Sequence, residues 1–130
     1  MAANGPVRTA VWLGDGRLAV AGDGLSLVDT GSWRVRSVDP RADSVLLAGD
    51  VLLASGRAAG LAAYDVDGRE RFHGLAGKDT FVAGVYAGRA YVGVAGVDPL
   101  EVLDLATGRV VGRRATLPWL LTAPASSWWD

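Results

Sequence analysis

Three aspartates recur along this chain at nearly equal intervals. Asp29, Asp65 and Asp104 lie 36 and then 39 residues apart, and carboxylates that gather in a fold can ligate a divalent cation or share acid–base work. Each aspartate, however, closes an apolar run and is followed within a few residues by a glycine, namely Gly31, Gly68 or Gly108. In that place an aspartate accepts hydrogen bonds from backbone N–H groups two or three residues further on. We therefore expect structural turn residues on three separate repeat units, with no shared ion.

His73 is the single histidine of the chain, and cysteine is absent. Protein zinc sites combine several such ligands, so we expect no metal site. As a general base His73 would need a partner such as Asp79 or Ser44, and a polar residue on an outer strand is the simpler interpretation. The glycine-containing pieces 14–16 and 93–96 match neither a dinucleotide-binding nor a phosphate-binding loop. The sequence thus predicts no catalytic residue, no cofactor-binding residue and no cofactor.

The elements that must position these residues are predicted to be short β-strands. Apolar runs alternate with turn pairs, which are Asp15-Gly16, Asp23-Gly24, Gly49-Asp50, Asp67-Gly68 and Ala87-Gly88. Asp-Gly between apolar runs is a strong hairpin signal, because both central positions of a type I′ turn need positive φ. No segment that is free of glycine for ten residues shows the i, i+3, i+4, i+7 spacing of apolar residues typical of a helix. The predicted fold class is therefore all-β.

The predicted strands form a unit of four that occurs three times. The runs are 7–14, 17–22, 25–30 and 34–38, then 44–49, 51–56, 60–65 and 69–73, then 81–88, 89–96, 100–105 and 109–114. In each group the third run carries the recurring aspartate at its end. Four strands in a period of about forty residues are typical of a β-propeller blade. A sandwich or small barrel is the alternative, but neither requires the aspartate to return in every fourth strand.

This pattern predicts about three four-stranded antiparallel meanders in a single domain, 1–130. We expect the blades at about 7–42, 43–78 and 79–115, followed by a C-terminal strand and tail at 116–130. Propellers typically have about four to eight blades, so three would leave two apolar blade faces open. The predicted architecture is a partial or oligomer-completed propeller.

The third unit resembles the PQQ-like and YVTN-type β-propeller repeats. The residues that carry the resemblance are R-A-Y-V-G-V-A-G (89–96) and L-E-V-L-D-L-A-T-G-R-V-V (100–111), with looser copies at 60–72 and 25–35. The resemblance spans roughly residues 7–114 and implies a propeller, a fold that serves as scaffold, binding platform or enzyme. Quinone-dependent members usually place a tryptophan shortly after the T-G turn. Here 110–113 reads V-V-G-R and 71–73 reads R-F-H, so no quinone cofactor is implied.

Charge and hydropathy limit the classes of partner that we expect the chain to bind. The chain has 130 residues, half of them apolar, and a formal net charge of −1, whereas nucleic-acid and membrane-surface binders need a basic face. The start M-A-A-N-G-P lacks the basic and apolar regions of a signal peptide. Apolar runs are far shorter than the ~18 residues of a membrane span. We expect no nucleic-acid partner, no membrane insertion and no signal peptide, and the compartment stays open.

Two functional hypotheses follow. The first is a non-catalytic binding or scaffold module, completed either by a second copy, with a dimer favoured, or by the rest of a longer propeller. The alternative is a fragment of a propeller enzyme or of an extracytoplasmic small-ligand sensor, with its site at the channel mouth.

The C-terminal tail holds Trp119, Trp128 and Trp129, which are three of the five tryptophans. They either pack over the end blade or anchor an interface, since tryptophan contributes strongly to interface energies.

Overall fold

The computed structural model describes residues 7–114, with the backbone alone at 97–99. This part of the chain contains β-strands and no helix, so the predicted all-β class is confirmed, and no helical segment in it could cross a membrane. The strands are β1 (Thr9–Gly14), β2 (Arg17–Gly22), β3 (Gly24–Asp29), β4 (Arg34–Asp39), β5 (Ser44–Ala48), β6 (Val51–Gly56), β7 (Gly60–Asp65), β8 (Glu70–Gly74), β9 (Thr80–Tyr86), β10 (Arg89–Val94), β11 (Val97–Asp104) and β12 (Val110–Arg114).

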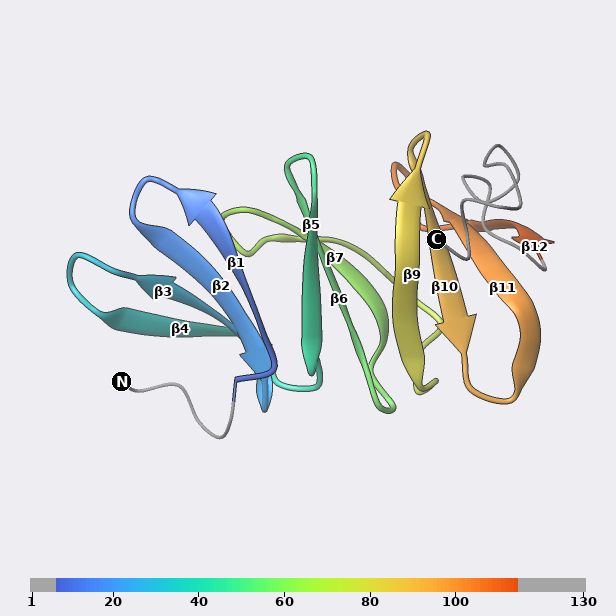
Figure 1. The fold of residues 1–130 in the computed structure, drawn as a ribbon, viewed down its shortest axis with the longest axis horizontal. Helices are drawn as coiled ribbons and strands as arrows, with labels where there is room; N and C mark the ends of the chain where they lie inside the picture. The colour runs from blue at the N-terminus through green and yellow to red at the C-terminus, as the bar shows by residue number, and fades with distance from the viewer. Residues whose placement is uncertain (1–6, 115–130) are drawn as a thin grey trace, which may run out of the picture.

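The strands make three four-stranded antiparallel meanders, in the order of the chain. Blade 1 is β1–β4, blade 2 is β5–β8 and blade 3 is β9–β12, and Figure 1 shows the three sheets in a row. The first strands, β1, β5 and β9, lie side by side. This is the predicted arrangement of propeller-like blades, and within residues 7–114 the row does not close into a ring.

The register lets positions in the three blades be matched. Arg17 lies opposite Asp29, Val51 opposite Asp65, and Arg89 opposite Asp104. Residues at the same distance from these aspartates, and those paired with them, therefore occupy matched positions. Matched residues can then be compared between the blades.

The φ angles show which of the predicted turn pairs have positive φ at both residues. At Asp15-Gly16 both residues have positive φ, 53° and 74°, and at Ala87-Gly88 the values are 52° and 75°, as a type I′ turn needs. At the other three predicted pairs only the glycine has positive φ.

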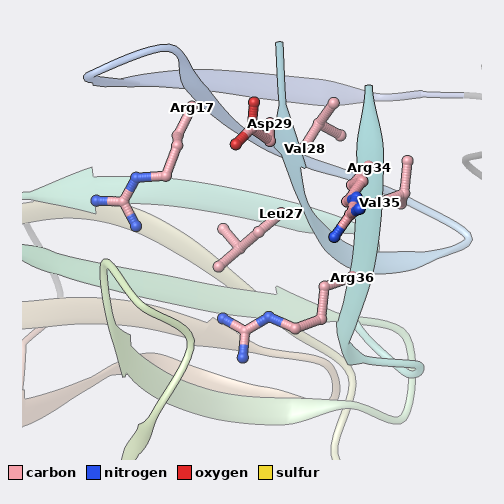
Figure 2. A pocket seen from close by; sticks show the side chains of 7 residues that line it. All are labelled: Arg17, Leu27, Val28, Asp29, Arg34, Val35 and Arg36. Atoms are coloured by element: carbon pink, nitrogen blue, oxygen red, sulfur yellow. The ribbon is translucent and has the colours of Figure 1, made fainter. Parts of the chain in front are cut away.

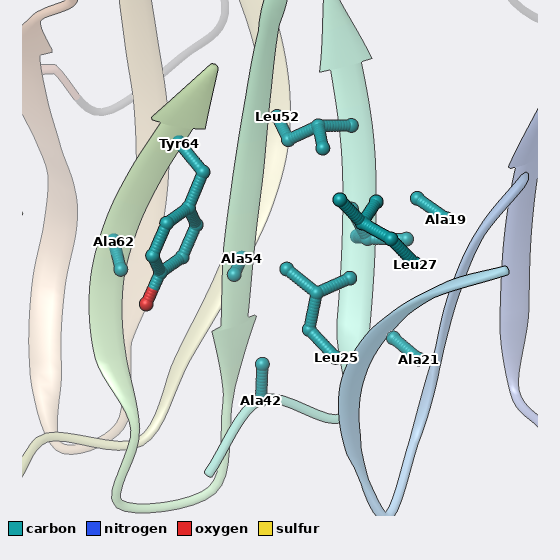
Figure 3. Close-up of a cluster of buried hydrophobic side chains, with 10 residues drawn as sticks. Ala19, Ala21, Leu25, Leu27, Ala42, Leu52, Ala54, Ala62 and Tyr64 are labelled. Carbon is teal, nitrogen blue, oxygen red and sulfur yellow. The ribbon is translucent and has the colours of Figure 1, made fainter. Parts of the chain in front are cut away.

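The core lies between the blades. Side chains alternate between the two faces of a strand, and blade 1 turns apolar residues of β2 and β3 toward blade 2 (Figure 3). The cluster between them consists of Ala19, Ala21, Leu25, Leu27, Ala42, Val45, Leu52, Ala54, Ala62 and Tyr64. A second cluster joins blades 2 and 3 and consists of Val51, Leu53, Leu61, Ala63, Ala90, Val92, Val94 and Leu103. Blade 2 is therefore covered on both faces, and every residue of β6 is buried.

We predict that Leu52→Ala lowers the free energy of unfolding by about 2–5 kcal/mol, because Leu52 is fully buried between two blades and truncation leaves a cavity. Urea denaturation at fixed protein concentration measures the loss. Leu46→Ala is the control on the neighbouring strand, where the side chain is 38% exposed, and its cost should stay below about 1 kcal/mol. Equal costs would mean that the inter-blade layer is not the core.

Candidate functional site

Each recurring aspartate caps the turn after the third strand of its own blade. The Oδ1 atom of Asp29 accepts hydrogen bonds from the backbone N–H groups of Gly31 (2.9 Å) and Ser32 (3.1 Å). The matching bonds run to Asp65 from Asp67 (2.9 Å) and Arg69 (3.0 Å), and to Asp104 from Ala106 (2.7 Å). The three carboxylates sit on three different sheets. Among the described side chains, those of residues 7–96 and 100–114, no cluster of three or more histidine, cysteine, aspartate or glutamate residues could hold a metal ion.

The backbone donors also change the acidity of two of these groups. Hydrogen bonds from Ser32 and Gly31 stabilise the ionised form of Asp29 and lower its pKa below the ordinary 3.8. The backbone bond from Arg69 lowers the pKa of Asp65 in the same way. Both turns are therefore held best when the aspartate is charged.

We predict that the protein loses stability as the pH falls through the acid range. Because the folded-state pKa of Asp29 and Asp65 lies below the unfolded value, their contribution is present above 3.8 and is lost as the pH falls toward the folded pKa. Urea unfolding from about pH 6 to about pH 2.5 measures the slope. The double variant Asp29→Asn, Asp65→Asn retains an acceptor oxygen in each turn but no charge, so its slope should be shallower. An unchanged slope would contradict the assignment.

The glycine of the turn has a structural role in two of the three blades. A Cβ at Gly68 would lie 2.9 Å from the Arg36 guanidinium, and one at Gly108 would lie 2.5 Å from the Phe72 ring. Both neighbours belong to the fourth strand of the preceding blade. At Gly108 both the close Phe72 ring and the positive φ favour glycine, whereas at Gly68 the Arg36 end can shift and the positive φ is the main requirement.

Gly31 does not play this part in blade 1. The N–H of Trp33 donates to the Asp29 carbonyl (2.7 Å), as the N–H of Gly108 donates to the Asp104 carbonyl (2.7 Å). Trp33 also has the positive φ, 58°, whereas Gly31 does not. Gly31 contributes its N–H to the Asp29 carboxylate, but Trp33 occupies the position matched to Gly108. In the first unit the glycine nearest the aspartate therefore lies earlier in the turn than Gly108 does in the third unit.

The pocket drawn in Figure 2 concentrates three arginines, which is a candidate anion site by composition. Two of these side chains already serve the joint between blades 1 and 2. Arg17 Nη1 donates to the Val66 carbonyl and to Asp67 Oδ1, both at 3.0 Å, and Arg36 donates to the Asp67 carbonyl. These arginines hold the β7–β8 turn of blade 2 against blade 1.

His73 lies on β8, the outer strand of blade 2. Its Nε2 atom is 3.1 Å from the carbonyl oxygen of Ala59. The two side chains considered as its partners make other bonds: Asp79 Oδ1 accepts from the Ala58 N–H (2.6 Å), and Ser44 Oγ donates to Asp43 (3.1 Å). The bonds of Asp79 and Ser44 are thus made to Ala58 and Asp43, and that of His73 to the backbone at Ala59.

One buried polar pair links the first two blades. The Tyr64 hydroxyl donates to Asp39 Oδ2 at 2.8 Å, and the Arg41 N–H donates to Asp39 Oδ1 at 2.9 Å. Both Asp39 and Tyr64 are buried. Burial, followed by the hydrogen bond to Asp39, raises the pKa of Tyr64 well above its ordinary value, so the phenol stays protonated and continues to donate.

We predict that Tyr64→Phe lowers the free energy of unfolding by about 1–3 kcal/mol, because it leaves a buried carboxylate oxygen without its donor. Chemical denaturation measures the change. In the Asp39→Ala background the same substitution should cost clearly less, since the acceptor is already gone. Additive losses in the double variant would show that the hydroxyl and the carboxylate are not coupled.

Two sheet faces remain as candidate interaction surfaces. We call the face of a blade toward the preceding blade its front face, and the opposite face its rear face. The front face of blade 1 consists of Ala10, Trp12, Leu18, Val20, Ser26, Val28 and Val35. Ala10 and Trp12 are exposed, whereas Val20 and Val28 are buried. Within residues 7–114 no further sheet covers it.

Trp12 lies at a front-face position that can be matched in all three blades. It lies opposite Leu18, as Leu47 lies opposite Leu52 and Val85 opposite Ala90. The matched Leu47 and Val85 both pack into the cluster shared with the preceding blade. Trp12 is 57% exposed. A docking position is therefore filled by a tryptophan that no other described blade covers.

The rear face of blade 3 is the other end of the row. It carries Phe81, Arg89, Tyr91, Gly93, Leu100, Val102 and Gly112. Phe81 is 60% exposed, and its ring lies over Gly93, where a Cβ would be 2.0 Å from it. Tyr91 and Val102 are buried. The matched rear positions in blades 1 and 2 face the following blade.

Sequence reasoning singled out other tryptophans as interface residues. Trp119, Trp128 and Trp129 lie outside the described residues, so their assignment stays a prediction. Trp12 and Trp33 were not singled out from the sequence, because their exposure and their matched positions are visible only in the folded blades.

Comparison of the chain with protein-family models and with curated proteins found no match.

Proposed function

We propose that this chain is a non-catalytic binding or scaffold module whose open blade faces are completed by further blades. The observation that carries the proposal is the match between the open front face of blade 1 and the covered front faces of blades 2 and 3. Exposed apolar faces of this kind mark interaction sites. The titratable groups, by contrast, serve turns and joints.

A second copy of the chain is the favoured source of the missing blades. The rear face of one copy would meet the front face of the other, and a two-fold axis would repeat that joint. Two copies make a ring of six blades, within the range of about four to eight that propellers use, whereas three copies make nine. The rest of a longer propeller would serve the same purpose. Kinship with the PQQ-like and YVTN-type repeats belongs to this proposal, and its support is the repeat pattern.

We predict that the protein sediments with twice its chain mass of 13.5 kDa. Trp12→Asp should weaken the association about tenfold or more, because it places a charge in an apolar joint. Sedimentation equilibrium over a range of concentrations measures both. Arg57→Asp adds the same side chain on an exposed loop and should leave the association unchanged. A monomer of 13.5 kDa at every concentration would contradict self-assembly.

A further inference from the structure

The two covered joints share a contact between a small and a large residue. The small residue lies in the turn after the third strand, and the large residue lies on the fourth strand of the preceding blade. Gly68 faces Arg36 at the first joint, and Gly108 faces Phe72 at the second. In both cases the glycine accommodates a long or bulky side chain.

At the two open faces the sizes are reversed. The turn of blade 1 presents Trp33, which is 60% exposed and matched to Gly108. On the fourth strand of blade 3, Gly112 lies opposite Val102, as Arg36 lies opposite Leu27 and Phe72 opposite Ala63. A Cβ at Gly112 would meet nothing within 4 Å. At these faces the large residue lies in the turn and the glycine lies on the fourth strand.

We infer that Trp33 of one copy packs over Gly112 of a second copy. The inference rests on the proposed function and names the contact that determines the partner. Trp33 would have to displace the Arg36 side chain if blade 1 met the rear face of another blade 1, and it would collide with Phe72 on the rear face of blade 2. The rear face of blade 3 lacks that obstacle, so this chain carries both halves of a complementary joint, and the occupant is its own second copy.

The backbone of Trp33 supports a role for its side chain. A φ of 58° is strained for a bulky residue, and glycine would relax it. Strain of this kind is retained where the side chain has a use.

A polar contact at the joint points the same way. Arg89 is exposed and matched to Arg17, since each lies opposite the aspartate of its blade. Arg17 donates to the carbonyl of Val66, the residue after Asp65. At the open joint the matched acceptor is the carbonyl of Thr30, which follows Asp29. Arg89 would thus repeat, between copies, the bond that joins blades 1 and 2.

The test exchanges the two sizes. Trp33→Gly and Gly112→Phe should each raise the dimer dissociation constant about tenfold or more, the first by removing the large residue and the second by filling its place. The double variant restores a glycine facing a phenylalanine, as at Gly108 and Phe72, and should recover most of the affinity. Sedimentation equilibrium measures all three. Neither single change should unfold the chain, because glycine relaxes position 33 and Gly112 has open space.

Val110→Phe is the matched control. It adds the same ring to the same strand, but its partner Leu103 faces blade 2, so the dimer should be unaffected. If the wild type is a dimer and none of these substitutions changes its dissociation constant, the inferred contact is wrong and the proposed function still stands. The same conclusion follows if both single variants weaken the dimer and the double variant does not recover. A wild type that never associates would remove the proposed self-assembly itself. Circular dichroism of each variant verifies that the sheets are formed.

Discussion

The structure depends on covering β-sheets that are apolar on both faces. A single four-stranded meander hides neither face from water, and burial of apolar surface is the main force available to a chain without disulfides or helices in its described part. Blade 2 is covered on both faces, since clusters on both sides bury all of β6. Blades 1 and 3 are each covered by another blade on one face only. At the two ends of the row Trp12 and Phe81 remain exposed. These end faces are therefore where we look for a function.

Polar contacts at the joints set how one blade sits on the next. Several of them use the backbone as partner. Thr9 Oγ1 accepts from the N–H of Val45 (3.0 Å), and Thr80 Oγ1 donates to the carbonyl of Gly60 (2.5 Å). Backbone partners are present whatever the side chain, so these contacts do not depend on which apolar residues fill the joint. Positions in different blades can be compared because the strand register matches them.

The charged residues that first suggest chemistry are used for architecture. Asp29 and Asp65 hold their charge within turns, Arg17 and Arg36 hold a neighbouring turn, and Asp39 accepts the bond of Tyr64. A side chain committed in this way has little freedom to bind a substrate. No other blade in the described residues covers the two sheet faces at the ends of the row, and these faces combine apolar residues with the exposed Arg89.

The strands, their grouping in fours and the capped turns could all be predicted from the amino-acid sequence. These features depend on neighbours within a few residues: an Asp15-Gly16 pair that accepts positive φ, or an Asp104 carboxylate that reaches the N–H of Ala106. The pairing of sheet faces, and the match of Trp33 rather than Gly31 to Gly108, became visible only in the folded blades. Such contacts join residues far apart, as when Arg17 binds Val66 across 49 positions. No local pattern records them, because a side chain acquires its partner only when the blades stack.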